Sequence, residues 1–276
     1  MTALTSPVDR SAVRQGEADG ETERIQEAAG IAPDDRLRAG ERLSLAEFDR
    51  RAAIGERAGV GLRAELIEGT VRVSAPPDLD RHAVPNADLQ TVLVLYQLAT
   101  PGVRRGANGV VRLSLDATAG VGPSLPNPDD MLFIDAGYGG QMARDDSGRR
   151  IGVPELIVEI ANTSAVEDLT DKRDLYERIG VQEYLVYAVR DRRLVAFRRR
   201  SEDDRFRTVE LDGGVFRSES FPGLHIDAAA LAREDLPAMQ ATLQSGLQTP
   251  EHAAFAHTLA DAKTSSDRAD EAAQKS

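Results

Sequence analysis

The sequence predicts a mixed α/β fold, in which a β-sheet of mixed strand direction is flanked by helices and carries added β-hairpins and a C-terminal helical segment. Three observations predict it. Residues 156–161 are apolar on both faces except at Glu159, which is typical of a central strand covered on both sides. Residues 84–98 are apolar over most of a helical surface, which predicts a buried helix. Short hairpins supply antiparallel strands, and this mixture indicates α/β or α+β.

The N-terminal half of this fold follows from local signals. Ser44 and Glu47 have the spacing of a capping box and predict a short helix to about residue 53. Residues 65–73 predict a hairpin that turns at Glu68-Gly69. The buried helix comes next and ends at Thr100-Pro101-Gly102. We then expect strands near residues 103–106 and 110–115, paired with each other around residues 107–109.

The C-terminal half begins with a short strand over residues 126–134, introduced by proline. A polar, glycine-rich excursion leads from it to the central strand. Asp168 is placed to cap a helix from residue 169 to about 179, which Gly180 ends. The remaining expected elements are a hairpin over 183–189 and 194–198, a second over 206–211 and 215–218, and mainly helix over 228–260.

The two ends of the chain have the composition of unfolded segments. Residues 1–40 hold few large apolar side chains and many charges, and residues 262–276 are small, polar and charged. Such segments bury too little apolar surface to offset their chain entropy. We therefore expect a disordered segment over 1–40, one folded domain over 41–261 and a disordered tail over 262–276.

Composition excludes several classes of protein. The chain has no cysteine, which excludes disulfides, thiolate zinc sites and cysteine nucleophiles. It has no apolar run long enough for a membrane span and no signal-peptide pattern, so we expect no membrane partner and a cytoplasmic location. The net charge of −12 argues against coating nucleic acid by bulk electrostatics, although a local site can still contact it.

Glu159 and Lys172 stand out as candidate functional residues. An ionised carboxylate in a buried strand is normally paired, protonated or bound to a metal. The simpler interpretation is a strand-end glutamate paired with an arginine. Lys172 is the only lysine before residue 263 in a chain rich in arginine, and helical angles place it at the centre of an apolar stripe. The simpler interpretation of Lys172 is a side chain that packs its stem and reaches water.

Asp129 supplies a second candidate carboxylate at the start of a strand. Two carboxylates and an inward lysine suit a Mg²⁺ or Mn²⁺ site that also takes a substrate phosphate. The simpler interpretation is a strand-entry turn at Pro128-Asp129. Because side chains alternate along a strand, Asp129 and the neighbouring Asp130 should leave opposite faces, so only one can be a ligand, and we choose Asp129.

The ordered set Asp129, Glu159 and Lys172 resembles the PD-(D/E)XK nuclease superfamily, and more closely the Uma-two family of endonucleases. The likeness covers residues 44–255, and it lies in the order and spacing of several short motifs. These motifs are Glu65-Leu-Ile-Glu-Gly69, Pro76-Pro77 with His82, Thr100-Pro101-Gly102, Pro126-Asn-Pro-Asp129, Gly152-Val-Pro-Glu-Leu-Ile-Val-Glu159, Asp168-Leu-Thr-Asp-Lys172, Tyr176, Gly180-Val-Gln-Glu-Tyr-Leu185, Phe221-Pro-Gly-Leu224 and Pro250-Glu-His-Ala-Ala-Phe255.

The resemblance implies a restriction-endonuclease-like domain that hydrolyses phosphodiester bonds in DNA with Mg²⁺ or Mn²⁺. It implies that Asp129 and Glu159 hold the metal, that Lys172 is catalytic, and that Glu65 and His82 belong to the site. The sequence departs from the family pattern at Thr163-Ser164 and at Asp130. The alternatives are an inactive binding or regulatory module of the same fold and a phosphohydrolase acting on a small phosphoester. A homodimer is compatible with the sequence, which does not determine the oligomeric state.

Overall fold

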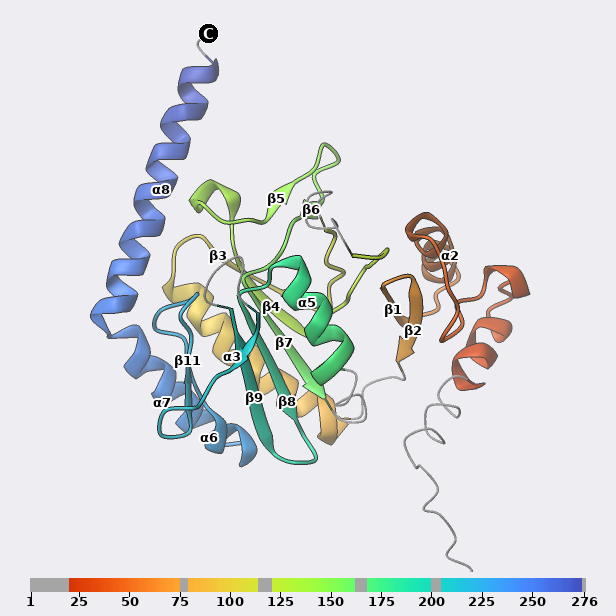
Figure 1. Ribbon diagram of the computed structural model, residues 1–276, viewed down its shortest axis with the longest axis horizontal. Helices are drawn as coiled ribbons and strands as arrows, with labels where there is room; N and C mark the ends of the chain where they lie inside the picture. The colour runs from red at the N-terminus through yellow and green to blue at the C-terminus, as the bar shows by residue number, and fades with distance from the viewer. Residues whose placement is uncertain (1–19, 75–78, 114–120, 162–167, 200–204, 275–276) are drawn as a thin grey trace, which may run out of the picture. The chain divides into compact units, whose positions relative to one another are not determined.

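The computed structural model describes residues 20–74, 79–113, 121–161, 168–199 and 205–274 (Figure 1). The described chain forms two compact units, and the expectation of one folded domain over 41–261 stays a prediction. The first unit comprises residues 1–76 and 122–125, and the second comprises residues 77–121 and 126–276. Thr163-Ser164 and Pro76-Pro77 lie outside the described residues.

The first unit contains a short helix, a hairpin and a small core. Its elements are a helical segment over residues 20–28, η1 (Pro33–Asp35), α2 (Leu45–Arg57), β1 (Arg63–Ile67) and β2 (Thr70–Ser74). Ser44 caps α2, because its hydroxyl accepts a hydrogen bond from Glu47 N at 3.2 Å. Glu68 and Gly69 connect β1 to β2 with φ angles of 49° and 81°, the left-handed values that a two-residue hairpin turn requires. The predicted cap and hairpin are confirmed.

Residues before 41 also take part in packing contacts of the first unit. Ile31 and Leu37 are buried, and Leu37 packs in a cluster with Phe48 of α2 and Val71 of β2. The side-chain amide of Gln26 accepts a hydrogen bond from Leu37 N at 2.8 Å and donates one to Leu37 O at 2.9 Å. These few contacts compensate for the low apolar content on which the expectation of disorder rested. That expectation stays a prediction only for residues 1–19, which the structure does not describe.

The second unit is built on a six-stranded sheet in the order β10-β9-β8-β7-β4-β3. Its strands are β3 (Val103–Ala107), β4 (Asp130–Ile134), β7 (Leu156–Ala161), β8 (Glu183–Ala188), β9 (Arg193–Arg198) and β10 (Arg207–Thr208). Only β7 and β8 pair in parallel within this sheet, and its other neighbours are antiparallel. The predicted mixed sheet is confirmed, with Leu156–Ala161 as a central strand in which all six residues are buried.

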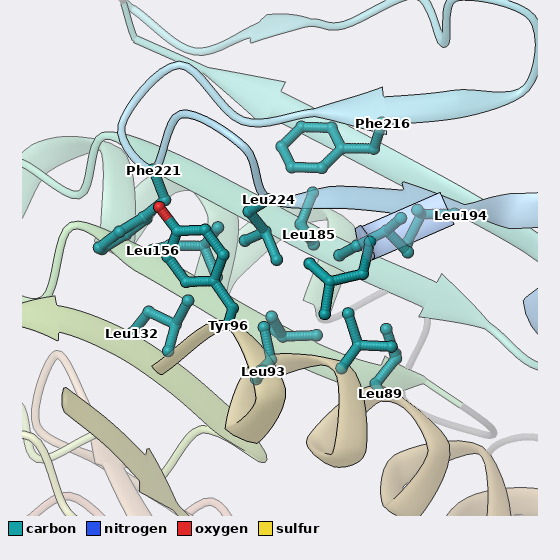
Figure 2. Packing of buried hydrophobic residues seen from close by; sticks show 14 of the residues in the cluster. Leu89, Leu93, Tyr96, Leu132, Leu156, Leu185, Leu194, Phe216, Phe221 and Leu224 are labelled. Carbon is teal, nitrogen blue, oxygen red and sulfur yellow. The ribbon is translucent and has the colours of Figure 1, made fainter. Parts of the chain in front are cut away.

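Helices cover both faces of this sheet. One face packs against the long helix α3, and the other carries α5 (Figure 1). The helices are α3 (Val84–Ala99), α5 (Arg173–Ile179), α6 (Ala228–Ala232), α7 (Leu236–Leu247) and α8 (Pro250–Gln274), with the single turns η2 (Leu79–Ala83) before α3 and η4 (Asp168–Lys172) before α5. Leu89, Leu93 and Tyr96 of α3 point toward the strands in the core (Figure 2). Helix α8 continues through residues 262–274, which were expected to form a disordered tail.

Two predicted strand pairings are wrong. β3 pairs with β4, whereas a partner was expected at residues 110–115, of which the structure describes 110–113 as non-strand. Likewise β10 pairs with β9, and β11 (Val215–Arg217) pairs with β12 (His225–Asp227). In both cases a local Gly turn predicted a neighbouring hairpin. The interior strands β4 and β9 need a partner along each edge for their backbone groups, and the edge strands β3 and β10 supply it. The excursion after β4 holds η3 (Ala136–Tyr138) and a small hairpin of β5 (Ala143–Arg144) and β6 (Arg150–Ile151). No helix in the described ranges is long and apolar enough to cross a membrane.

Candidate active site

The candidate site lies where β4 separates from β7. The last Cα pair between these strands is Asp130 with Val158, so Asp129 stands at the level of Glu159. The backbone carbonyl of Asp129 accepts a hydrogen bond from Asn108 N at 3.0 Å, while its side-chain Oδ2 accepts one from Ile160 N at 2.7 Å. A carboxylate oxygen thus satisfies the strand N–H that a longer β4 would have bonded. This exchange holds the buried Asp129 carboxylate against β7, one residue from Glu159.

Glu159 projects from β7 toward α5 and is 2% exposed. Its Oε1 accepts two hydrogen bonds, one from Lys172 Nζ at 3.1 Å and one from the Tyr176 hydroxyl at 3.1 Å. Residues four apart lie on one face of a helix, so the donors reach the same oxygen from successive turns. These donors compensate for the desolvation of the buried carboxylate.

Lys172 is 8% exposed and lies at the junction of η4 and α5. Its inward orientation, predicted from helical angles, is confirmed by its contact with Glu159. The contact of its ammonium with the buried Glu159 argues against the interpretation of Lys172 as a side chain that reaches water. A charged pair of this kind is retained only where both ends have good hydrogen-bond geometry.

His82 joins the same group of side chains from η2, the turn before α3. Its Nε2 lies 3.3 Å from Asp129 Oδ1. The two oxygens of Asp129 therefore contact His82 on one side and the backbone of β7 on the other. Through these contacts the structure brings His82, Asp129, Glu159 and Lys172 together from η2, the residue before β4, β7 and η4.

Asp130 has a partner of its own outside this group. Asp130 is fully buried and forms an ion pair with Arg105 of β3 at 2.7 Å. Burial raises the pKa of Asp130 to about 7, and the nearby Arg105 guanidinium opposes that rise. Asp129 and Asp130 therefore have different partners, as strand alternation predicts. Glu65 is buried on β1 in the first unit, and its place in the site stays a prediction.

The donor set has the chemistry of a magnesium site. Within the described part of the chain no group of three or more His, Cys, Asp and Glu side chains is arranged to hold a metal ion. Mg²⁺ does not require such a group, since it binds through one or two carboxylates and completes its shell with water and substrate phosphate. Asp129, just before β4, and Glu159, on the neighbouring strand β7, offer hard carboxylate oxygens, so these residues fit that ion.

Tyr176 is a site contact that the sequence did not assign. It was expected only as part of the apolar stripe of its helix and as a motif residue. The structure shows it fully buried, with its ring 5.0 Å from that of Tyr184 and its hydroxyl on Glu159. A usable signal was present, because Tyr176 is four residues after Lys172 and must share its helix face.

Comparison with known proteins identifies a family and a structural relative. The family model described as "Uma2: Putative restriction endonuclease" matches residues 45–229. The crystal structure of a putative nuclease belonging to DUF820 from Anabaena variabilis aligns with 62% of this chain and 90% of that chain, at 16% identity and a TM-score of 0.47. No curated protein matches the chain.

Proposed function

The chain belongs to the Uma2 family, described as putative restriction endonucleases, and from this premise we propose that it is a metal-dependent endonuclease that hydrolyses phosphodiester bonds in DNA. Asp129, Glu159 and Lys172 form the site in this proposal, and His82 and Tyr176 support it. The class of activity is inferred from the family. The assignment of residues to the site is supported by the geometry at the point where β4 separates from β7.

The observation that supports the site best is the pair of contacts on β7. Asp129 Oδ2 bonds to Ile160 N at 2.7 Å, and Lys172 Nζ bonds to the neighbouring Glu159 at 3.1 Å. Asp129 and Lys172 are 43 residues apart in the sequence. They nevertheless make contacts at two consecutive residues of β7, Asp129 at Ile160 and Lys172 at Glu159. Burial of all three charged groups is expensive unless their charges serve one another or a ligand.

Asp129 and Glu159 would hold Mg²⁺ or Mn²⁺. When bound, the ion supplies Lewis-acid polarisation of the phosphoryl group and makes water easier to deprotonate. The backbone N–H of Ile160 orients the Asp129 carboxylate, and the hydroxyl of Tyr176 orients that of Glu159. Fixed ligands of this kind need little reorganisation when charge develops in the reaction.

Lys172 acts on the substrate in this proposal. Its ammonium is a compact charge that can approach a phosphate oxygen or a water, and it lies beside a ligand of the metal. It would stabilise the negative charge that develops on the phosphoryl group. His82 holds the other carboxylate from the opposite side, with a contact of 3.3 Å to Asp129 Oδ1.

A direct test uses supercoiled plasmid, single-stranded DNA and RNA with Mg²⁺, Mn²⁺ or EDTA. We expect cleavage of DNA with either metal and none with EDTA. The Asp129→Asn and Glu159→Gln variants should be inactive while remaining folded. Equal cleavage by the wild type and by both variants would assign the activity to another site or to a contaminant.

A further inference from the structure

A pair of exposed arginines lies at the same end of the sheet as the candidate site. Residues 189–192 connect β8 to β9, and Arg192 and Arg193 are both exposed. The turn is fixed to the sheet, because Val189 N donates to Ala161 O at 3.0 Å and Arg192 N donates to Val189 O at 3.1 Å. Ala161 is the last residue of β7, the strand that carries Glu159. The arginines therefore lie at the strand end at which the site is built.

Strand register places Arg193 on the same face of the sheet as Glu159. Glu159 pairs with Val186, and two residues farther along, Ala161 pairs with Ala188. Ala188 in turn pairs with Arg193 on β9. Because alternate residues share a face, the row Ala161, Ala188 and Arg193 lies beside the row that contains Glu159. Arg193 lies two residues along and two strands across from Glu159, which corresponds to a distance of about 12 Å between the two positions in the sheet.

The side chains between the two positions are small. The other members of the row that contains Arg193 are Ala188 on β8 and Ala161 on β7, and both are buried alanines. DNA carries a phosphate every ~3.4 Å of axis on each strand, so a backbone that reaches Glu159 passes Arg193 within about three or four nucleotides. The spacing suits one continuous phosphate track from the site to the turn.

The local charge differs from that of the whole molecule. The net charge is −12, and many arginines of this chain are paired with carboxylates, such as Arg198 with Glu183 and Arg105 with Asp130. Neither Arg192 nor Arg193 forms an ion pair with any residue that the structure describes. Asp191 lies in the same turn, and Glu234 acts electrostatically on Tyr187 together with Arg192, so Arg192 is partly offset. Arg193 lies on the face of the sheet opposite to Tyr187 and is the stronger candidate for binding a phosphate.

We propose that Arg193, assisted by Arg192, binds the phosphate backbone of double-stranded DNA and guides it to the site at Asp129 and Glu159. The inference rests on the proposed nuclease function and adds to it the route of the substrate. Local contacts of this kind position the duplex without reading its sequence. They explain how an acidic chain can hold a polyanion at one place.

The test measures binding separately from cleavage. A fluorescein-labelled DNA duplex is titrated in EDTA over a series of NaCl concentrations, and anisotropy gives Kd. The test variant is Arg192→Gln/Arg193→Gln. The control is Arg144→Gln/Arg149→Gln, which removes two exposed arginines from the β5–β6 hairpin, between the end of β4 and the start of β7, at the opposite end of the sheet.

We expect the test variant to bind about tenfold or more weakly at 0.1 M salt and to lower the salt slope by roughly 1 to 2, as for the loss of one or two phosphate contacts. The control should bind like the wild type, and both variants should melt like the wild type. An unchanged Kd and slope, an equal loss in the control, a loss seen only with an RNA duplex, or no binding by the wild type would each overturn the inference. If DNA binding depends on Arg192 and Arg193 but the wild type cleaves no DNA, the nuclease proposal is refuted while the binding inference stands.

Discussion

Lys172 Nζ lies 3.1 Å from Glu159 Oε1, and the hydroxyl of Tyr176 lies at the same distance from the same oxygen. A positive charge and a neutral donor therefore share one acceptor in a buried place. The two donors differ in kind, which allows their contributions to be separated. Removing the ammonium changes the charge of the site, whereas removing the hydroxyl leaves the charge unchanged.

Substitution of Lys172 should reduce turnover and leave metal binding in place. Lys172→Met keeps the volume of the side chain but removes its charge from the phosphoryl group. We expect kcat to fall by about 10²-fold or more, as for loss of a comparable charge-stabilising group. Because the metal ligands remain, Mn²⁺ should still bind in a calorimetric titration and still raise the melting temperature.

Lys172→Arg provides the matched control for charge. A planar guanidinium keeps the positive charge but cannot occupy the place of a compact ammonium in a buried contact with Glu159. Turnover should therefore be nearly as low as in Lys172→Met. Full activity in the arginine variant would show that only the charge matters and that the lysine has no special geometry.

Tyr176→Phe should weaken metal binding without unfolding the protein. The change removes one hydrogen bond to Glu159, a loss of about 1.5–3 kcal/mol for a bond to a charged group, and leaves the ring packed on Tyr184. We expect a higher metal concentration for half-maximal activity and a smaller Mn²⁺-induced rise in melting temperature.

The control for Tyr176→Phe is Tyr187→Phe. Tyr187 is also a buried tyrosine, but it lies in the core cluster on the α3 face of the sheet. Its hydroxyl can be removed without touching Glu159. If both variants shift the metal dependence equally, Tyr176 has only a structural role.

The sequence predicted much of this fold from short patterns. The two-faced apolar run identified β7, the cap at Ser44 located α2, and the Glu68-Gly69 turn located its hairpin. The wrong pairings of residues 110–115 and 206–211 had one cause. A turn signal describes a few neighbouring residues, whereas the choice of strand partner depends on which distant surfaces must be buried.

The candidate site was also visible in part. Glu159 and Lys172 were found because a charge interrupted an apolar pattern, and the structure joins them. The partners of Asp129 could not be predicted, because its contact with Ile160 N depends on the point at which β4 leaves β7. Tyr176 resembles an ordinary core residue in a pattern of hydrophobicity, and only its spacing of four residues from Lys172 places it on the helix face that contacts Glu159.

Asp129 and Asp130 should respond differently to the loss of charge. Asp129→Asn removes a proposed metal ligand and should abolish both cleavage and the Mn²⁺ response of the melting temperature. Asp130→Asn alters the pair with Arg105 and should lower stability while keeping far more activity. Plasmid cleavage and thermal melting with and without Mn²⁺ separate the two effects. Loss of the metal response in Asp130→Asn alone would place the ligand at residue 130.

Leu37→Ala should destabilise the first unit. Leu37 is 4% exposed and packs against Phe48 and Val71, so the substitution leaves a cavity that costs about 2–5 kcal/mol. Chemical unfolding followed by circular dichroism measures the loss. Ile25→Ala is the control, because Ile25 is 39% exposed in the preceding helical segment and its truncation should change stability little. Equal effects of the two substitutions would contradict a packed role for Leu37.

Glu155 should make the stability of the second unit sensitive to pH. It is 6% exposed and accepts hydrogen bonds from Ile134 N at 3.0 Å and Gln141 N at 3.3 Å. Burial raises its pKa above the ordinary value of 4.5, and those backbone donors oppose the rise. A carboxyl with a raised pKa in the folded state holds its proton more tightly there than in the unfolded chain. Its contribution to the free energy of unfolding is therefore present at low pH and lost as pH rises through the folded pKa.

Glu155→Gln isolates this effect, because glutamine has the same shape and does not titrate. One of its side-chain atoms becomes a donor facing a backbone N–H, which lowers stability by about 1–3 kcal/mol at every pH. At low pH the wild type should therefore be the more stable protein. As pH rises above the ordinary carboxyl pKa of 4.5, the wild type should lose stability relative to the variant and the gap should narrow. Denaturant unfolding of both proteins across this range measures the gap, and a gap that widens with pH would mean that the backbone donors outweigh burial at Glu155.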